Sequence, residues 1–365
     1  MRIGVPKEIK VHEYRVGLTP DAVAELTSRG HQVTVEANAG AAIDFSDADY
    51  LAAGAEIVAS AQAVFEGADL IVKVKEPQLQ ECAWLKPHQT LFTYLHLAAD
   101  RPQAEALMRS GATCIAYETV TDDRGGLPLL RPMSEVAGRM SVQVGAHYLE
   151  KAQGGRGVLL GGVPGVAPAT VAILGGGVSG VHAAEMAVGF RADVTIYDIS
   201  TARLAELDQV FGGKVKTVFA SKAAVAAAVR QSDLVIGAVL VPGAAAPKLV
   251  TRAMLKTMKR GAVLVDIAID QGGCFETSRA TTHDAPVFVE EGIVHYCVAN
   301  MPGAVARTST LALGNATLPF VLAIADQGAQ AAMAANPHLA RGLNIAGGTI
   351  RHSAVAEALA LPLAA

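Results

Sequence analysis

The chain has 365 residues, of which 51% are hydrophobic, 18% are charged and only 5% are aromatic. This length leaves room for two domains of about 150 residues each. A composition so apolar, with 36 glycines, is typical of an α/β protein with large buried sheets. The formal net charge is −4 and no Lys/Arg run occurs, which argues against a nucleic-acid partner.

Gly, Pro and charged residues interrupt every apolar stretch before it reaches the roughly 18 residues of a membrane span, so no membrane association is expected. The first 15 residues lack the apolar core of a signal peptide. Cys82, Cys114, Cys274 and Cys297 show neither a C-x-x-C motif nor metal-ligand spacing. We therefore expect a cytoplasmic protein without a metal site.

Residues 1–128 alternate apolar strand patterns with helical patterns, which predicts a parallel α/β sheet. Thr19 is the expected cap of the first helix, with Pro20 at its first position and Gly30 at its end. Strands are expected within 2–6, 31–37, 55–58, 69–77, 89–97 and 112–120, and helices near 19–30, 47–53, 61–67 and 100–110. This part has no glycine fingerprint of its own, so we expect it to bind the substrate.

Residues 129–150 predict a loop leading into a long helix, with Ser134 as its cap. The glycine-rich stretch 154–168 predicts a tight hairpin or loop. After it, residues 171–174 form an uninterrupted apolar run, typical of a parallel strand buried on both faces.

A G-x-G-x-x-G motif follows this strand directly. In the dinucleotide-binding reading, Gly175 permits the tight turn, Gly177 lets the backbone approach a pyrophosphate, and Gly180 allows close packing of helix on strand. The phosphates would bind the free N–H groups at the helix start. Asp198 ends the next strand, where an acid holds both ribose hydroxyls and repels a 2′-phosphate, so the cofactor expected is NAD; Arg203 weakens this preference slightly.

Further strands are expected within 215–220, 232–242, 261–273 and 292–303, followed by a helical segment from 305 and a C-terminal tail. The predicted fold is therefore α/β, with two Rossmann-like, doubly wound parallel-sheet domains and a cleft between them. Residues 129–304 form the NAD-binding domain, and 1–128 with 305–365 form a discontinuous substrate domain.

Ligands of parallel sheets bind outside the carboxyl ends of the strands. Arg15 follows the first predicted strand, and Lys75 and His96 end the apolar runs of two later ones, so all three fall at the same edge of the sheet. Arg15 has the donor fork that suits a small carboxylate, with a surface ion pair as the alternative. Lys75 is preferred over Lys73 because it lies nearer the strand end. His96 suits proton transfer near neutral pH, although an isolated histidine is more often a core residue.

In the second domain, Asp270 is expected to end a strand and to be the acid beside the nicotinamide, whereas the earlier Asp266 is expected to be structural. Asn300 and Met301 follow the last strand and would contact the nicotinamide end. Val239 and Leu240 would cover the cofactor, with core packing as an equal alternative.

With these residues identified, the sequence resembles alanine dehydrogenases. The similarity spreads from residue 4 to about residue 310, through the stretches GVPKEIKVHEYRVGLTP, KVKEP, PMSEVAGRMS, LGGGVSG, VDIAIDQGGCFETS and CVANMPGAVARTST. The RVGLTP block is shared with the NAD-binding subunit of transhydrogenases, whereas the acid block around Asp270 is more particular to alanine dehydrogenase. One departure is Ala220, where family members can carry a serine that touches the cofactor; Ser221 is its possible substitute.

The resemblance implies that Arg15 and Lys75 bind the substrate carboxylate and that His96 and Asp270 are the catalytic pair. It also implies a homohexamer that converts L-alanine into pyruvate and ammonium. The NAD contacts that it implies are Ser134, Val178, Ser179, Asp198, Arg203, Val239, Leu240, Ile267, Asp270, Arg279, Val298, Asn300 and Met301. Two other classes remain open, namely an NAD-binding transhydrogenase subunit and a non-catalytic NAD-responsive binding protein.

Overall fold

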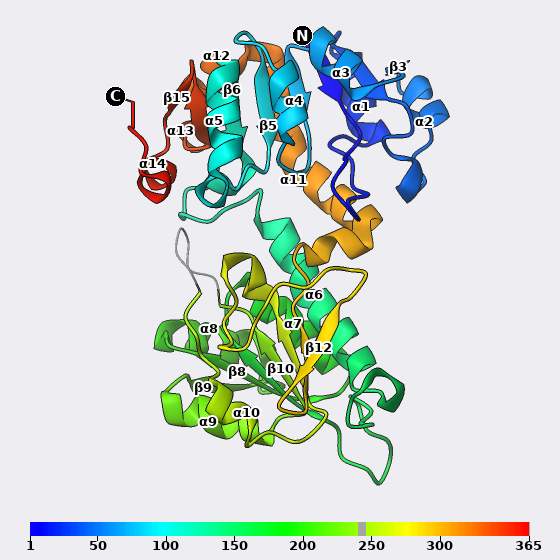
Figure 1. Cartoon of the computed structure of the whole chain (residues 1–365). Helices are drawn as coiled ribbons and strands as arrows, with labels where there is room; N and C mark the ends of the chain where they lie inside the picture. Colours follow the sequence, from blue (N-terminus) through cyan, green and yellow to red (C-terminus); the bar gives the residue numbers. More distant parts are fainter. Residues whose placement is uncertain (240–245, 365) are drawn as a thin grey trace. The chain divides into compact units, whose positions relative to one another are not determined.

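The computed structural model describes residues 1–239 and 246–364. The chain forms two compact units (Figure 1). Unit 1 consists of Met1–Met133 with Val305–Ala365, and unit 2 consists of Ser134–Ala304. The chain thus leaves unit 1 within one helix and returns to it for its last part.

The sheet of unit 1 has the strand order β15-β14-β6-β5-β4-β1-β2-β3. Its first six strands in the chain pair in parallel, in the doubly wound order 3-2-1-4-5-6. Their bounds are β1 Arg2–Val5, β2 Gln32–Glu36, β3 Glu56–Val58, β4 Leu70–Val72, β5 Thr90–Thr93 and β6 Thr113–Ala116. The predicted parallel sheet is confirmed, although β4 and β5 end earlier than the apolar runs suggest.

Helices connect these strands. Thr19 caps α1 and Pro20 opens it, as predicted. The bounds are α1 Pro20–Ser28, η1 Ala41–Ile43, α2 Asp47–Ala52, α3 Ala61–Gly67, α4 Leu79–Trp84, η2 Leu97–Ala99, α5 Arg101–Ser110 and η3 Tyr117–Thr119. Helix α4 was not predicted, because its six residues show little helical periodicity.

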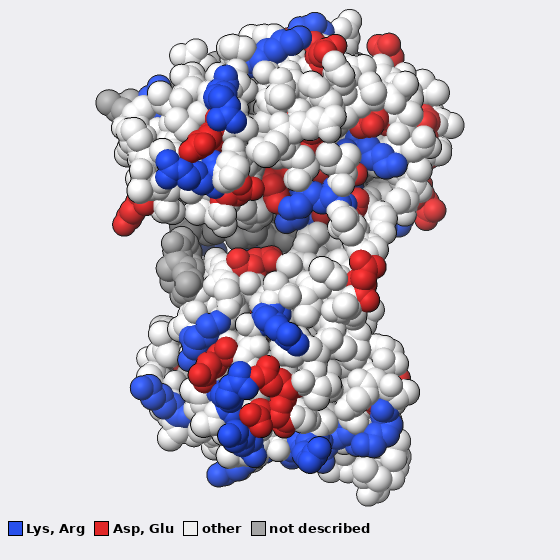
Figure 2. All heavy atoms as spheres, viewed as in Figure 1, with Lys and Arg blue, Asp and Glu red and all other residues white. Residues whose placement is uncertain are grey.

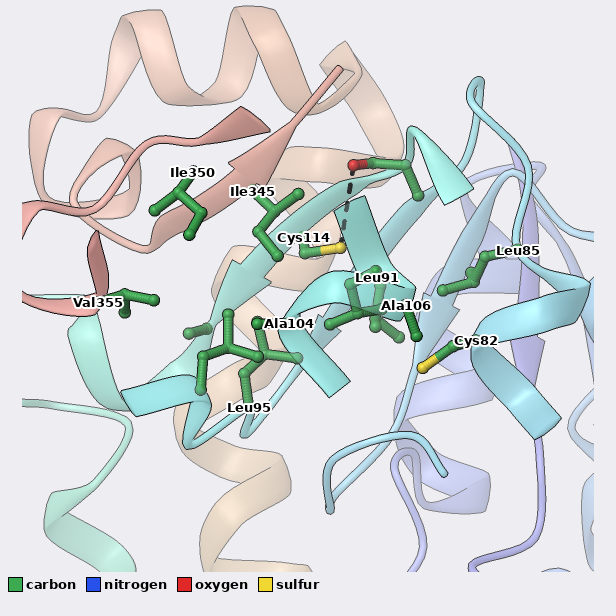
Figure 3. Packing of buried hydrophobic residues seen from close by; sticks show 14 of the residues in the cluster. Cys82, Leu85, Leu91, Leu95, Ala104, Ala106, Cys114, Ile345, Ile350 and Val355 are labelled. Atoms are coloured by element: carbon green, nitrogen blue, oxygen red, sulfur yellow. Dashed lines mark hydrogen bonds between the residues drawn. The ribbon is translucent and has the colours of Figure 1, made fainter. Parts of the chain in front are cut away.

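The C-terminal part is more ordered than the predicted tail. After α11 (Ala306–Gln327) come α12 Ala329–Ala335, α13 Pro337–Ala340, β14 Leu343–Ala346, β15 Thr349–Ile350 and α14 Ser353–Leu359. Strand β14 pairs antiparallel with β6 and so extends the sheet (Figure 1). Ile345, Ile350 and Val355 join a buried core with Leu95 and Ala104 (Figure 3). The last residues therefore pack directly on the region of His96.

Unit 2 repeats the same topology. Its order is β12-β13-β11-β10-β7-β8-β9, and its six parallel strands again run 3-2-1-4-5-6. The strands are β7 Thr170–Leu174, β8 Asp193–Asp198, β9 Lys216–Phe219, β10 Leu234–Gly237, β11 Val263–Asp266, β12 Val287–Glu290 and β13 Ile293–Tyr296. The antiparallel β12 was not predicted; it pairs with β13 at the sheet edge.

The remaining elements of unit 2 are α6 Arg131–Tyr148, which begins in unit 1, and then η4 Lys151–Gln153, α7 Val178–Gly189, α8 Thr201–Phe211, α9 Lys222–Gln231, α10 Arg252–Leu255, η5 Ile267–Gln271 and η6 Met301–Val305. The assignment of Ser134 as a helix cap is wrong. Helix α6 already begins at Arg131, because Pro132 fits the first turn, where its missing N–H leaves no bond unmade. Val163 and Val166 bond each other in the predicted glycine-rich hairpin.

Residues Met301–Gln327 form a helix long and apolar enough to cross a membrane by length and composition, with a mean hydropathy of 1.4 in its most apolar window. This corrects the expectation that Gly and Pro interrupt every such stretch, since Pro319 lies inside the helix without ending it. Gly314 lies against Thr19 at the start of α1, and Val321 and Ile324 are fully buried. Helix α11 therefore packs on α1 as a core helix does.

On the face that Figure 2 shows, Lys and Arg side chains are interspersed with Asp and Glu in both units. This distribution agrees with the absence of any Lys/Arg run in the sequence.

Candidate active site

In unit 1, the three predicted substrate residues follow adjacent strands. Arg15 lies in the loop after β1, Lys75 follows β4, and His96 follows β5. The order β5-β4-β1 makes these strands neighbours, and all three are parallel. A Cβ on Gly17 would lie 2.4 Å from the Val72 carbonyl oxygen, so only glycine lets the Arg15 loop pass this close to the end of β4.

Arg15 is almost completely buried and pairs side-on with Glu13. Its Nε donates to Glu13 Oε1 at 2.7 Å and its Nη2 to Oε2 at 2.6 Å, while Nη1 lies 3.0 Å from Met133 Sδ. Burial by itself would lower the pKa of Arg15, but the hydrogen bond and charge of Glu13 outweigh it and the pKa is raised. A guanidinium has five N–H donors in a planar fork, which is the geometry that recognises carboxylates.

The two lysines near the end of β4 differ in environment. Lys73 is fully buried, with Nζ 2.8 Å from Glu81 Oε1 and 3.2 Å from Glu8 Oε2. Lys75 is partly exposed, and its backbone N–H donates to Glu8 Oε1 at 3.2 Å. Lys73 therefore has an internal ion-pair role, whereas Lys75 is partly exposed and its Nζ lies 3.9 Å from Glu76 Oε2.

The charges of Lys75 and His96 both affect the pKa of Glu76. Burial would raise the pKa of Glu76, but the positive charges of Lys75, Lys10 and His96, together with a hydrogen bond from Lys10, lower it. His96 is exposed and has φ 50° and ψ 34°, a left-handed conformation. Its ring stacks on Tyr94 with the centroids 5.7 Å apart. Because β4 and β5 are parallel neighbours, Lys75 and His96 lie at the same edge of the sheet.

In unit 2, each glycine of the motif has the environment that its predicted role requires. Gly175 has φ +106°, and a Cβ there would lie 2.7 Å from the Ala238 carbonyl oxygen. A Cβ on Gly180 would lie 1.9 Å from the Gly175 oxygen, which is the predicted close packing. Gly177 caps α7, and among residues 1–239 and 246–364 no heavy atom outside its chain neighbours lies within 4 Å of its Cβ position, which is the room that a phosphate would need.

Asp198 ends β8 beside this turn, as predicted. Its Oδ2 accepts from Gly176 N at 2.7 Å and its Oδ1 from Ser200 N at 2.8 Å. Arg203 Nε donates to the Gly176 carbonyl oxygen at 2.7 Å, and its Nη1 pairs with Glu206. Asp198 and Arg203 therefore hold Gly176 from both sides, and the charge of Arg203 is partly neutralised.

Asp270 does not end a strand, contrary to expectation. Strand β11 ends at Asp266, and Asp270 lies exposed in η5. The fully buried Asp266 accepts from Ala268 N at 3.1 Å, Cys274 N at 2.9 Å and Ser278 Oγ. This carboxylate turns the chain out of the sheet earlier than the apolar run suggests, and it holds both ends of the segment that carries Asp270.

Most of the other predicted cofactor residues also follow strand ends of this sheet. Val239 follows β10 and is partly buried, and Leu240 lies outside the described residues. Ile267 follows β11, and Val298, Asn300 and Met301 follow β13. Val178 and Ser179 open α7, and Ser179 Oγ donates to the Ser134 carbonyl oxygen at 2.9 Å. Arg279 lies in a later loop over the Phe288 ring at 4.0 Å, and Ser221 caps α9.

Sequence reasoning missed the carboxylates and the aromatic ring that surround the predicted residues: Glu8, Glu13, Tyr94 and Glu118. They follow β1, β5 and β6, and the rule that selected Arg15 and His96 also covers these positions. Within 1–239 and 246–364, no group of three His, Cys, Asp or Glu side chains is placed to hold a metal ion.

Comparisons with known proteins agree with this geometry. Residues 4–137 match the family described as "Alanine dehydrogenase/PNT, N-terminal domain", and residues 141–353 match its C-terminal domain. The chain belongs to the alanine dehydrogenase/PNT family. It is 63% identical to a protein named alanine dehydrogenase from Halomonas elongata, with 99% of this chain and 97% of that protein covered.

Solved structures of the family show the same fold. A structure titled L-alanine dehydrogenase superposes with a TM-score of 0.96 at 51% identity, with 99% of each chain covered. A transhydrogenase from Sinorhizobium meliloti superposes with a TM-score of 0.82 at 26% identity, with 97% of this chain and 100% of the other covered. Within the family, the chain is thus much more similar to the alanine dehydrogenase than to the transhydrogenase.

Proposed function

We propose that the chain is an NAD-dependent alanine dehydrogenase. It converts L-alanine, NAD⁺ and water into pyruvate, ammonium, NADH and a proton, and it catalyses the reverse reductive amination. The observation that carries the proposal is 63% identity over nearly the full length to a protein named alanine dehydrogenase. The glycine turn of unit 2 and the cationic strand ends of unit 1 support it independently.

Unit 2 is the proposed NAD-binding domain. The open space at Gly177 and the free N–H groups of the first turn of α7 fit a pyrophosphate. The carboxylate of Asp198 ends β8, where it fits the adenosine ribose. NAD⁺ bound by these residues would supply the acceptor for the hydride from C2 of alanine. The residues named from the strand ends β10, β11 and β13 would line the rest of the cofactor.

Unit 1 is the proposed substrate domain. Arg15 and Lys75 hold the alanine carboxylate and so fix the direction in which the C2 hydrogen points. Loss of hydride leaves iminopyruvate, to which water adds before ammonia leaves. Asp270 is assigned the proton transfers of these two steps, and His96 polarises or protonates the oxygen that becomes the carbonyl of pyruvate. The competing assignment exchanges these two roles.

An absorbance assay at the NADH wavelength tests the proposal. We expect L-alanine to reduce NAD⁺, and pyruvate with ammonium to oxidise NADH. A transhydrogenase subunit would instead transfer hydride to a second nucleotide, and a binding protein would bind NADH without turnover. Absence of turnover with alanine, serine and other small amino acids would exclude the proposal.

Two substitutions test the catalytic pair. We expect His96→Ala and Asp270→Asn each to lower kcat by about 10²–10⁴-fold, the usual contribution of general acid–base catalysis. The dissociation constant of NADH, measured by fluorescence titration, should change little for His96→Ala because the glycine turn is intact. Near-normal turnover with an unchanged pH profile in either variant would show that the assignment is wrong.

Two further properties complete the proposal, one implied by the resemblance and one inferred from the cysteines. The first is a homohexamer, which light scattering tests against six times the chain mass of 37.6 kDa. The second is a cytoplasmic location, which is supported by four buried cysteines that are all free thiols.

A further inference from the structure

The loop after β5 is held in a strained conformation. His96 has φ 50° and ψ 34°, within the left-handed region that non-glycine residues rarely adopt. A residue in this region persists only where the surrounding structure determines it. The strain occurs at the residue to which the proposed function assigns proton transfer.

The carboxylate of Glu118 is the group that holds this turn. Its Oε1 accepts from His96 N at 2.6 Å and from Leu95 N at 3.2 Å, and its Oε2 accepts from Leu95 N at 3.2 Å. Glu118 reaches these amides because Thr93 of β5 pairs with Ala116 of β6, so the two strands end side by side. Successive N–H groups next to a left-handed residue form a concave site for an anion.

The same short element also restrains the His96 ring. Glu118 and Tyr117 both belong to η3, and the Tyr117 ring packs edge-on against Tyr94 at 5.1 Å. Tyr94 in turn stacks on His96, with 13° between the ring planes. The Tyr94 hydroxyl donates to the Leu129 carbonyl oxygen at 2.6 Å, which fixes the orientation of the Tyr94 ring.

We propose that Glu118 is a positioning residue for His96: its carboxylate holds the Leu95 and His96 amides so that the imidazole points to the substrate from a fixed left-handed turn. This inference rests on the proposed role of His96. A carboxylate suits this role because its Oε1 accepts from both amides and its Oε2 also faces the Leu95 N–H. A glutamine offers one oxygen, and its NH₂ would face an amide donor.

A double-mutant cycle separates positioning from general stability. We expect Glu118→Gln to lower kcat by about 10- to 100-fold, since a displacement of about 1 Å costs this much, with a smaller change in KM for alanine. In the His96→Ala background the same substitution should change kcat less than about twofold. An equal loss in both backgrounds, or no loss in the wild-type background, would overturn the proposal.

Asp123→Asn is the matched control, because Asp123 is an exposed carboxylate of the same unit that pairs with His338 at 2.8 Å. It should leave kcat unchanged. If Glu118→Gln does not fold, Glu118→Asp serves in the same cycle, since it keeps both oxygens but withdraws them by one methylene. An undiminished kcat in Glu118→Asp with an unchanged pH profile would equally contradict the proposal.

Hydrogen exchange tests the contact without any activity. We expect amide exchange in a peptide covering residues 94–99 to become faster in Glu118→Gln and to stay unchanged in Asp123→Asn. If exchange is faster in Glu118→Gln but the wild-type protein does not turn over alanine, the proposed function is wrong and the carboxylate contact is still supported. Unchanged exchange would refute the contact, whatever the enzyme does.

Discussion

The two units have the same strand order but differ in the connection that follows the central strand of each sheet. In unit 2, residues 175–177 alone separate β7 from α7, and they are all glycine. In unit 1, residues 6–19 separate β1 from α1 and include Glu8, Glu13 and Arg15. The short turn presents main-chain N–H groups, whereas the long loop presents side-chain charges. In our proposal, one topological position is thus adapted to phosphate in one unit and to a carboxylate in the other.

The two units also share a structural feature, which is a carboxylate that accepts hydrogen bonds from main-chain amides after a strand end. Glu8 accepts from Val74 N at 2.7 Å and from Lys75 N, and Glu118 accepts from the His96 turn. In unit 2, Asp198 and Asp266 do the same for the segments that follow β7 and β11. Loops that carry chemistry are therefore held by charged acceptors, which bind amides more strongly than neutral acceptors do.

Gly180→Ala should have the largest effect on the glycine turn. Its Cβ would lie 1.9 Å from the Gly175 oxygen, so the turn must shift. Such overpacking costs about 1–3 kcal/mol, and if all of it opposes binding, NADH affinity falls by roughly 5- to 150-fold. Gly189→Ala in the same helix is the control, because within 1–239 and 246–364 no neighbouring atom outside the local helix backbone lies within 4 Å of its Cβ position. Equal NADH titrations for both variants would show that the turn is not the phosphate site.

Much of this contrast could be predicted from the sequence. The glycine spacing specifies a turn and its cap by local sterics, and the carboxyl-edge rule selects Arg15, Lys75 and His96 without knowledge of distances. The antiparallel strands β12, β14 and β15 could not be predicted, because short edge strands depend on pairing with distant residues.

The position of Asp270 shows a different limit. The run VLVDIAID reads as one strand, but Asp266 is fully buried and accepts the Ala268 amide, which starts a 3₁₀ turn. Similarly, no local pattern relates Glu118 to His96, since their contact exists only because β5 and β6 are neighbours. Polar contacts between segments are therefore the part of the site that periodicity cannot supply.

Lys73→Met should have a smaller effect than the glycine substitution on ligand binding but a large effect on the stability of unit 1. It leaves Glu8 and Glu81 buried without their cation, which typically costs about 3–5 kcal/mol. Lys216→Met in unit 2 is the control, since it breaks an exposed pair with Asp193 worth about 0–1 kcal/mol. Chemical denaturation measures both. Similar losses in the two variants would contradict the view that the buried ion pairs of Lys73 contribute more stability than the exposed pair of Lys216.

The smallest expected effect is a pH dependence of unit 2. Burial lowers the pKa of His295 below its ordinary value of 6.5, and Arg279 and Arg252 lower it further, against the opposing Ile293 carbonyl and Glu290. Its Nε2 lies 2.8 Å from Thr277 Oγ1 and its Nδ1 lies 3.0 Å from the Ile293 oxygen. As the pH falls, His295 therefore takes up its proton at a higher pH in the unfolded chain than in the folded protein. Below about pH 6.5 this difference destabilises the fold progressively.

His295→Gln keeps polar atoms in this place but cannot take up a proton. We expect it to flatten the fall in Tm between pH 7 and pH 5 by a few degrees, because 1 kcal/mol shifts Tm by about 2–4 °C in a domain of this size. His147→Gln, at an exposed position of α6, should leave the slope as it is in the parent chain. A slope that is the same in all three proteins would mean that the acid sensitivity lies in unit 1, where burial also lowers the pKa of His352.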